Sequence, residues 1–414
     1  MRVWLINHHA IPPTEPGGTR HYALATELIR RGHCVTVIAS SFNHAAGAQI
    51  ACRTKGQLST VTRFGEVPFL FLYVPAYRGR VDRLWNMLIF ALKVWNCVGT
   101  RHLQKPEIVI GSSLTLPAAF AASRLAHRLG VPFVLEIRDL WPQTLIDMGM
   151  SPWHPAVVGF GVIERFLYRN STKIITLLPN ATELIVSRGG RSQDIVWIPN
   201  GVDMSLIPWS DSPPHDVFTV MYAGSHGLSD ALDPVLDAAT ILNRQSPGRF
   251  RFRLLGSGPA KDALRRRVHA EEIANVVFED PVSKLEIFSK MQEADAFIIS
   301  MKKTGLYRYG ISPNKLHEYM AAGRPTIVAG SVQNNPVADS SAGITVPPED
   351  PNAIAAAVET LAAMTLAERR DMGIRGRRYV EQHHSFSILG YRLEEVLQSA
   401  LSSSELARNE QPKK

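Results

Sequence analysis

Cysteine is scarce in this sequence: Cys34, Cys52 and Cys97 are far apart and odd in number. Their spacing fits neither a disulfide framework nor a zinc site, so we expect a reducing, cytoplasmic environment. No apolar run of the sequence reaches the roughly 18 to 20 residues that span a bilayer. The first residues enter a strand pattern directly and lack the succession of a signal peptide. We therefore expect no membrane-spanning segment.

Two common nucleotide-binding motifs are also missing. None of the glycine-rich turns forms a Gly-x-Gly-x-x-Gly dinucleotide fingerprint or a Walker A loop. Their absence argues against a nicotinamide dehydrogenase and against a P-loop kinase.

The composition is that of a well-packed globular protein. Of the 414 residues, 45% are apolar and 20% are charged, and no block has low complexity. This length suits two domains of common size. The net charge of +8 suits an anionic partner, which could be a nucleotide diphosphate, lipid head groups or nucleic acid. We expect no nucleic-acid partner, because the interleaved aromatic and basic residues of RNA-binding modules are absent.

Short β-branched runs alternate with helical stretches through the whole chain, a pattern typical of α/β doubly wound sheets. A helix is predicted from Thr19 to Arg31. The predicted buried parallel strands are Val3–Ile6, Val35–Ile38, Ile108–Ile110, Phe133–Ile137, Ile174–Leu177, Phe218–Tyr222, Phe252–Leu255, Val276–Phe278, Ala296–Ser300, Pro325–Val328 and Ile344–Val346.

The proline-rich stretch Ile207–Pro214 is the expected linker between two domains. We predict an N-terminal Rossmann-like domain at residues 1–205 and a C-terminal one at 206–384. The helical stretch 385–401 is expected to pack back on the first domain, and 402–414 is expected to be a flexible tail.

Glycine-rich turns follow the first strand of each predicted domain, where open sheets bind ligands. Gly17 and Gly18 lie directly ahead of a helix, whose free N–H groups suit an anion. A flexible loop with a threonine cap is an equally good interpretation. In the second domain, Gly224 and Ser225 follow one strand, and Gly256 follows the next.

The stretch from Ser312 to Gly323 predicts a loop that leads into a helix, with Pro313 in its first turn. Glu318 would lie one turn inside this helix, where its carboxylate could accept hydrogen bonds from both hydroxyls of a ribose. The alternative is a solvated glutamate that only favours the helix dipole.

In the first domain, Arg138 and Asp139 follow a strand at the edge that faces the expected ligand. They could contact a substrate or pair with each other. His8 and His9 lie at the same edge, and a histidine at a strand end is more often structural than catalytic.

These segments together resemble the family-four retaining glycosyltransferases of the GT-B fold, over nearly the whole chain. The resemblance rests on Gly17-Gly18, Arg138-Asp139-Leu140-Trp141-Pro142, Ile198-Pro199-Asn200-Gly201-Val202-Asp203, Gly256-Ser257-Gly258 and Tyr309-Gly310-Ile311-Ser312-Pro313-Asn314-Lys315-Leu316. The motifs that begin at Arg138 and at Tyr309 are similar to the branch that contains N-acetyl-L-fucosamine transferases of O-antigen and capsule synthesis.

The resemblance implies two Rossmann-like domains that face each other across a cleft, a UDP-sugar donor and a polyprenyl-diphosphate-linked saccharide as acceptor. It also implies donor binding by Gly17, Gly18, Gly224, Ser225, Gly256, Ser312, Asn314, Lys315 and Glu318, and catalysis by Arg138, Asp139 and Lys315. Catalysis would rest on stabilising the leaving diphosphate and an oxocarbenium-like sugar.

The sequence departs from the family pattern at two places. The family's first glutamate, eight positions before Glu318, is Gly310 here, and the loop that begins at Gly224 lacks the usual arginine and lysine. We expect Lys315, the backbone around Ser312 and Asn314, and Arg20 to balance the diphosphate charge instead. No Asp-x-Asp metal-binding triplet occurs, so neither a metal nor another cofactor is expected.

Two alternative functions share this pattern: a nucleotide-sugar epimerase on the same scaffold, and a non-catalytic binding protein. The stretch Arg83–Val98 is an apolar helix with a narrow polar stripe at Asn86, Lys93 and Asn96. It suits either an interfacial anchor on anionic lipid or a buried crossover helix. With a lipid-linked acceptor, the first interpretation predicts peripheral contact with the inner face of the cytoplasmic membrane.

Overall fold

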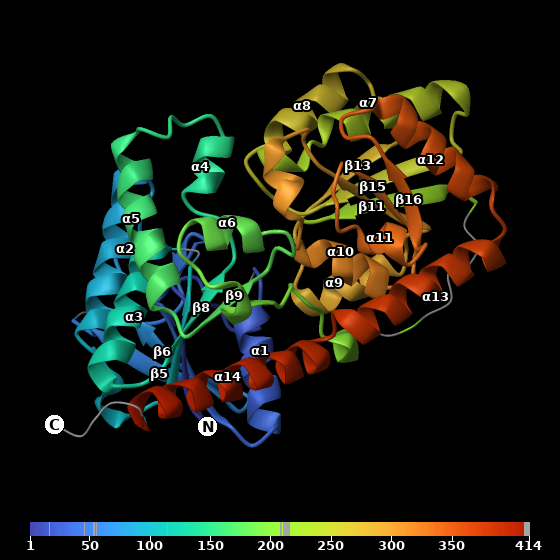
Figure 1. Cartoon of the computed structure of the whole chain (residues 1–414). Coiled ribbons are helices and arrows are strands. Elements are labelled where there is room, and N and C mark those ends of the chain that lie inside the picture. Colours follow the sequence, from blue (N-terminus) through green and yellow to red (C-terminus); the bar gives the residue numbers. More distant parts are fainter. Residues whose placement is uncertain are drawn as a thin grey trace. The chain divides into compact units, whose positions relative to one another are not determined.

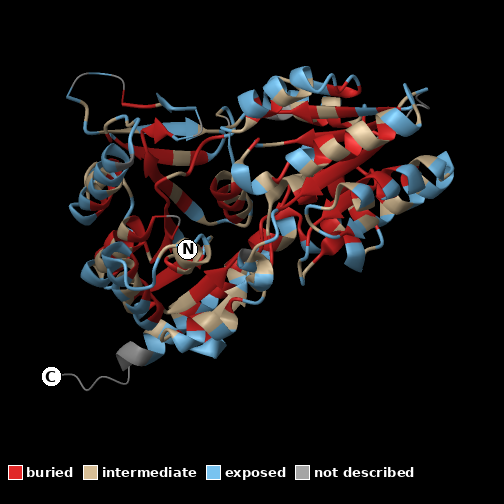
Figure 2. Ribbon diagram, turned by 90° about the horizontal axis from the view of Figure 1, so that it is seen from above, coloured by how far each residue is buried: buried red, intermediate tan, exposed pale blue. Residues whose placement is uncertain are grey.

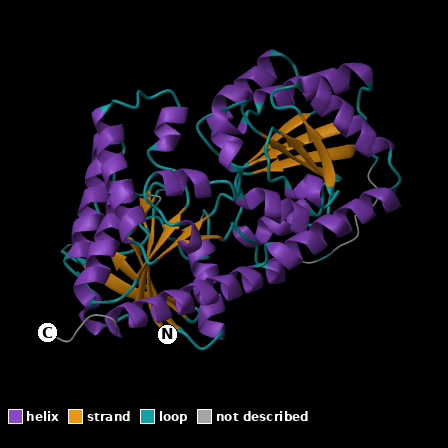
Figure 3. Cartoon of the chain, in the orientation of Figure 1, coloured by secondary structure: helices purple, strands orange, loops and turns teal. Residues whose placement is uncertain are grey.

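The computed structural model describes residues 1–15, 17–44, 46–52, 54, 56–113, 115–207, 209 and 216–409. The chain divides into two compact units. The first contains Met1–Pro199 and the segment from Phe386 onward, and the second contains Asn200–Ser385. In each unit, helices cover a sheet on both faces (Figures 1 and 3). Most of the expected linker, namely 208 and 210–214, lies outside the described residues.

The first unit is built on an eight-stranded sheet in the order β10-β9-β8-β7-β1-β2-β6-β5. Its neighbouring strands are parallel, except for the antiparallel pair β5 and β6. The elements of this unit are β1 (Arg2–Ile6), α1 (Arg20–Arg30), β2 (Cys34–Ser40), β3 (Phe42–Asn43), β4 (Ala48–Gln49), β5 (Ser59–Phe64), β6 (Val67–Leu72), α2 (Arg80–Trp95), β7 (Ile108–Ser112), α3 (Leu116–Leu129), β8 (Phe133–Ile137), α4 (Gln143–Asp147), α5 (Pro155–Asn170), β9 (Lys173–Thr176), α6 (Thr182–Ser187), β10 (Ile195–Trp197) and α14 (Phe386–Asn409).

Side-chain alternation divides the first sheet between two helical layers. Val3 and Leu5 of β1 pack into a cluster with α1 and α14, to which Leu389, Leu393 and Val396 contribute. Figure 1 shows α14 alongside α1, and α2, α3 and α5 on the other face of the sheet. The central strands β7 and β8 are buried along their whole length (Figure 2). Helix α14 is therefore part of the first unit's core.

The expected tail is shorter than predicted, because α14 continues to Asn409. The prediction of a tail from residue 402 onward is wrong for 402–409, where glutamate, leucine, alanine and arginine favour the helix. Residues 410–414 lie outside the described residues.

The second unit has a six-stranded parallel sheet in the order β13-β12-β11-β14-β15-β16. Its elements are β11 (Phe218–Ala223), α7 (Asp233–Gln245), β12 (Phe250–Leu255), α8 (Lys261–Ala270), β13 (Val276–Glu279), α9 (Lys284–Met291), β14 (Ala296–Ser300), α10 (Asn314–Ala321), β15 (Thr326–Ala329), α11 (Pro336–Asp339), β16 (Gly343–Val346), α12 (Pro351–Ala363) and α13 (Leu366–His383).

The same alternation builds the second unit. Val220 and Tyr222 of β11 pack with α7 and α12, and Met221 packs on the other face with α9, α10 and α13. The first and last segments of this unit pair through their backbones. Val202 N–H donates to His384 O over 2.9 Å, and Val202 forms a parallel bridge with Ser385. The two segments where the chain passes from one unit to the other therefore begin side by side.

The predicted fold class is confirmed, and every strand predicted from an apolar run is present. Phe133–Ile137 and Ala296–Ser300 have the predicted bounds, and the others shift by one or two residues at an end. The unpredicted strands are β5 and β6 at one edge of the first sheet, β10 at its other edge, and the short pair β3 and β4.

Candidate functional site

The strand order of the second sheet reverses between β11 and β14, with β12 on one side of β11 and β14 on the other. Ligands of open α/β sheets bind at such a switch point, outside the carboxyl ends of the strands. The segments that follow β11 and β14 contain Gly224, Ser225 and the approach to α10. The topology thus gathers the second unit's predicted residues at one edge of the sheet.

Helix α10 begins at Asn314, one residue later than expected. Pro313 has ψ 131°, which is extended, so it precedes the helix and does not form its first turn. The first N–H groups of a helix have no carbonyl acceptor in the preceding turn. Those of Asn314 and Lys315 are in this position, and the positive end of the helix dipole lies there. This end of α10 suits an anion.

Lys315 is the cation at this helix start. Its ammonium group donates to Tyr222 Oη over 2.6 Å, pairs with Asp230 and lies 4.6 Å from the centre of the Tyr222 ring. Burial lowers the pKa of Lys315 below its usual value, although the charge of Asp230 acts in the opposite direction. An ammonium group has three N–H donors, so one remains for a ligand.

Gly224 and Gly256 have a packing role that the sequence does not show. A Cβ on Gly224 would lie 3.3 Å from Cδ of Lys315, so the missing side chain leaves room for that lysine. A Cβ on Gly256, where φ is +135°, would lie 1.9 Å from Gly224 O. The two glycine-rich turns are therefore in backbone contact, and Gly256 supports the loop that touches Lys315.

Asp230 links Lys315 to the backbone of the loop after β11. One of its carboxylate oxygens pairs with Lys315, and the other accepts the Gly227 N–H over 3.0 Å. Tyr222 Oη donates to Ser225 O in the same network. Ser225 itself is exposed. Glu318 is the fifth residue of α10 and is half-buried. The second-unit candidates thus lie on three connected segments: the turn at Gly224, the turn at Gly256 and the segment that contains Lys315.

Gly310 explains why the first glutamate of the family pattern is missing. Its φ is +96°, a left-handed conformation that residues with a Cβ rarely adopt. Its N–H donates to Tyr307 O over 3.0 Å and closes a short turn before Ser312. A glutamate at position 310 would be strained in this turn.

The first unit holds Gly17, Gly18, Arg138 and Asp139. Gly17 and Gly18 are exposed ahead of α1, and Gly17 has φ +132°. Asp139 is exposed, whereas Arg138 is half-buried, and its Nε has no hydrogen-bond partner among the residues that the structure describes. The structure therefore places these four candidates in one unit and the remaining candidates in the other.

The expected role of Arg20 is wrong. Its guanidinium is 1% exposed and donates to Glu136 Oε1 over 2.8 Å, to Ile198 O over 2.9 Å and to Pro199 O. Arg20 and His21 hold the pKa of Glu136 well below its usual range, despite burial. A fully buried, fully engaged guanidinium is not available to a diphosphate, so Arg20 serves the fold.

Buried polar groups gather near the switch point of the first sheet, between β1 and β7. The ring nitrogens of His8 and His9 and the hydroxyls of Ser113 and Thr115 are buried and have no hydrogen-bond partner in the described part of the chain. Burial lowers the pKa of His8 to about 3. These rings are therefore neutral at physiological pH, where an imidazole both donates and accepts.

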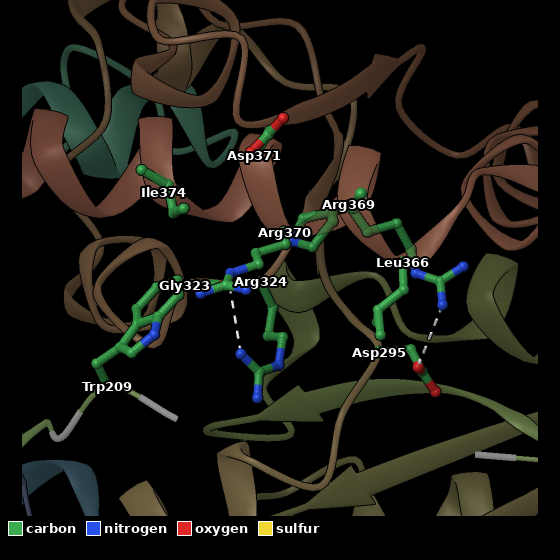
Figure 4. Close-up of a pocket in the computed structure, with 11 residues that line it drawn as sticks. Trp209, Asp295, Gly323, Arg324, Leu366, Arg369, Arg370, Asp371 and Ile374 are labelled. Carbon is green, nitrogen blue, oxygen red and sulfur yellow. Dashed lines mark hydrogen bonds and ion pairs between the residues drawn. The ribbon is translucent and has the colours of Figure 1, made fainter. Parts of the chain in front are cut away.

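A well-defined cavity of the second unit lies elsewhere. It has a volume of about 670 Å³ and is lined by Trp209, Asp295, Arg324 and Arg369, among others (Figure 4). Asp295 precedes β14 and Arg324 precedes β15, so this cavity is at the amino ends of the strands. It contains none of the predicted site residues.

Several residues of the site were not predicted from the sequence, namely Tyr222, Asp230, Asn200 and Asn334. Tyr222 and Asp230 follow no motif, and their link to Lys315 depends on contacts 93 and 85 residues apart in the chain. Asn200 belonged to a quoted motif, but nothing in that motif indicated its partner. Among the described residues, no group of three or more His, Cys, Asp or Glu side chains is arranged to hold a metal ion.

Comparisons with known proteins agree with this geometry. Residues 17–201 match the model described as a glycosyl transferase 4-like domain, and residues 217–364 match glycosyl transferases group 1. A comparison with curated proteins gives no match.

Solved structures share the fold at low identity. Sucrose-phosphate synthase from Thermosynechococcus elongatus has 15% identity and a TM-score of 0.73, over 97% of this chain and 99% of that one. Anabaena HepE in complex with UDP and glucose has 14% identity and a TM-score of 0.67, over 96% and 100%. An E. coli trehalose-6-phosphate protein bound with UDP-2-fluoro glucose has 12% identity and a TM-score of 0.71, over 96% and 99%.

Proposed function

Because the chain is a glycosyltransferase with a glycosyl transferase 4-like first part and a group 1 second part, we propose that its second unit binds a UDP-sugar. The proposed reaction is a retaining transfer of an N-acetylhexosamine-type sugar, such as N-acetyl-L-fucosamine, to a polyprenyl-diphosphate-linked saccharide in O-antigen or capsule synthesis. The family matches do not favour the epimerase alternative.

The observation that carries the donor proposal is the start of α10. Two helix N–H groups, one remaining Lys315 donor and the Ser312 hydroxyl lie within four residues of each other. Such a set suits the two phosphates of a nucleotide diphosphate. Glu318, one turn further along, is proposed to bind the ribose hydroxyls. Two of the solved structures with this fold contain UDP or a UDP-sugar by their own description.

The roles in catalysis follow from charge. Lys315 and the helix dipole are proposed to stabilise the diphosphate as it leaves, and Arg138 and Asp139 of the first unit are proposed to contact the transferred sugar or its acceptor. We propose that Gly17 and Gly18 let the backbone approach the donor. The reaction is proposed to need no metal ion.

A donor screen tests this function. Purified protein is incubated with UDP-sugars and extracted lipid-linked acceptors, with and without EDTA, and released UDP is measured. We expect release that depends on the acceptor and persists in EDTA. Release from the UDP-sugar alone with rearranged sugar would favour the epimerase, and restoration of an EDTA-sensitive activity by Mg²⁺ would contradict the metal-free proposal.

Replacing Glu318 with alanine should weaken UDP binding at least tenfold. The change removes two hydrogen bonds to a charged acceptor, each worth about 1.5 to 3 kcal/mol. Calorimetry measures the UDP affinity, and Glu318→Asp should also bind poorly because the shorter side chain loses the two-hydroxyl geometry. The control is Glu359→Ala, an exposed helical glutamate of the same unit. Unchanged UDP affinity in folded Glu318→Ala would show that the ribose contact is wrong.

We propose that the first unit meets its lipid-linked acceptor through the outer face of α2. Asn86, Phe90 and Val94 of this helix are buried, and Asn86 Nδ2 donates to Pro75 O over 2.6 Å. Six large apolar residues of the same helix are exposed, at helical spacing. They are Val81, Leu84, Trp85, Leu88, Leu92 and Trp95.

This arrangement accommodates both interpretations of the helix. Its inner face packs in the unit, and its outer face leaves an apolar stripe in water, which is costly unless a partner covers it. Residues 78–105 contain six lysines and arginines but one acidic residue, which suits anionic lipid. On α5 of the same layer, Val158 and Val162 are 50% and 61% exposed. No described helix is long and apolar enough to cross a membrane.

Replacing Val81, Trp85 and Leu92 together with serine should reduce binding to phosphatidylglycerol vesicles about tenfold or more. These side chains are 80%, 59% and 58% exposed, so the fold loses little packing. Sedimentation at low salt measures the binding, and calorimetry should show unchanged UDP affinity.

The matched control replaces Val61, Val186 and Val277, which are exposed on other surfaces, with serine. It should bind vesicles like the wild type. If the wild-type protein does not sediment with vesicles, or if both triple variants lose binding equally, the membrane proposal fails.

A further inference from the structure

Asn200, which belongs to the motif Ile198–Asp203, contacts Ser312 in the loop before α10. No role has yet been given to this motif. The backbone N–H of Asn200 donates to Ser312 Oγ over 2.7 Å, and its Nδ2 donates to Ser312 O over 2.5 Å. Only 6% of Asn200 is exposed. Ser312 lies two residues before α10. Asn200 therefore holds both oxygens of the residue that leads into the helix start.

This contact determines where the Ser312 hydroxyl proton points. A serine oxygen carries one proton and two lone pairs. The Asn200 N–H occupies one lone pair, and none of the residues that the structure describes accepts the proton in a hydrogen bond. The Oδ1 atom of Asn200 is buried and has no partner in the same part of the chain, so it does not accept this proton. The proton remains available to an acceptor from outside the chain.

Asn334 fixes the preceding residue in the same manner. Ile311 N–H donates to Asn334 Oδ1 over 2.8 Å, and Asn334 Nδ2 donates to Ile311 O over 2.9 Å. The two asparagine side chains thus bind three backbone groups of this loop: the N–H and the carbonyl of Ile311, and the carbonyl of Ser312. The loop needs this support because it has no regular secondary structure of its own.

We propose that Asn200 is a positioning residue for donor binding, which orients the Ser312 hydroxyl toward a phosphate oxygen of the donor diphosphate. The inference rests on the proposed function, since it concerns the same site. It also explains the Ile198–Asp203 motif: the asparagine at the start of the second unit is needed to shape a loop 112 residues later. Asn200 acts through Ser312 and does not itself touch the donor.

A double-mutant cycle tests this coupling, with UDP affinity measured by calorimetry for Asn200→Ala, Ser312→Ala and the double variant. We expect Asn200→Ala to weaken UDP binding about tenfold in the wild-type background and about twofold or less in the Ser312→Ala background. An equal effect in both backgrounds would overturn the inference, because Asn200 would then not act through the hydroxyl.

Asn275→Ala is the matched control for loss of a buried asparagine. Asn275 is 8% exposed, its Nδ2 donates to Ala239 O over 2.9 Å and its Oδ1 is also buried without a partner among the described residues. Both variants should lower the melting temperature, but only Asn200→Ala should weaken UDP binding. If both weaken it equally, the effect is general destabilisation. If the wild type binds no UDP, the proposed donor fails, whereas normal UDP binding by folded Asn200→Ala overturns only the positioning role.

Discussion

Replacing Lys315 with alanine is expected to weaken UDP binding by about 10- to 150-fold and to reduce turnover further. This range corresponds to the loss of one charge-assisted hydrogen bond to a phosphate, worth about 1.5 to 3 kcal/mol. Turnover should fall more than affinity because the leaving diphosphate gains charge in the transition state, where a fixed cation has its largest effect.

The loop after β11, which contacts Lys315, offers no second lysine or arginine that could replace the lost charge. The turn after β11 contains no arginine or lysine from Gly224 to Leu228, and Arg20 is engaged in the fold of the other unit. The pH dependence gives a second test. Since burial lowers the pKa of Lys315, raising the pH toward that pKa removes the charge, and the advantage of the wild type over Lys315→Ala should shrink.

The control for Lys315→Ala is Lys290→Ala. Lys290 also forms an ion pair in the second unit, with Glu279 Oε2 over 2.9 Å, but it lies on α9 and not at the helix start. It should bind UDP like the wild type. In Lys315→Ala the carboxylate of Asp230 loses its cation, which can also lower stability. The double variant Lys315→Ala with Asp230→Asn removes this unpaired charge, so any remaining loss of UDP affinity reflects the missing contact of Lys315 with the donor. Normal UDP affinity in that double variant would contradict the role of Lys315.

Replacing Gly256 with alanine should destabilise the second unit by about 3 to 5 kcal/mol, mainly because the new Cβ would overlap Gly224 O. The new Cβ would lie 1.9 Å from a backbone carbonyl oxygen, which cannot rotate away as a flexible side chain can. The φ of +135° adds strain for any residue with a Cβ. The loop that supports Lys315 should shift, and UDP affinity should fall with stability.

Gly248→Ala is the control for the backbone strain alone. Gly248 has φ +77°, but a Cβ there would meet nothing within 4 Å. We expect it to cost about 1 kcal/mol and to leave UDP binding unchanged. Denaturant unfolding measures both variants. Equal destabilisation of the two would mean that contact between the glycine turns is not important.

The sequence was sufficient to predict the elements whose formation depends on local pattern. The runs Phe133–Ile137 and Ala296–Ser300 are buried on both faces, so their composition alone identifies them as central strands. The run Val67–Leu72 was not predicted. It contains Pro68, a residue that is rare in interior strands, yet Pro68 pairs with Arg63 of β5.

The parts of the site that could not be predicted depend on partners far along the chain. Arg20 has the position of a ligand-binding arginine at a helix start, and only its contact with Glu136, 116 residues away, shows its structural role. The same is true of α2. Asn86 was assigned to the polar stripe of this helix, but it is buried and donates to Pro75 O. Local periodicity does not identify the face that the rest of the chain covers.

The pairing of Val202 with His384 and Ser385 has a consequence for how the protein is made. The second unit is one continuous insertion whose ends meet, so the ribosome delivers all of it before Phe386 and the rest of α14 emerge. The first unit must wait for this helix, because Leu389, Leu393 and Val396 complete its core. The second unit is therefore the first that has its full sequence for folding, although the first unit's synthesis begins earlier.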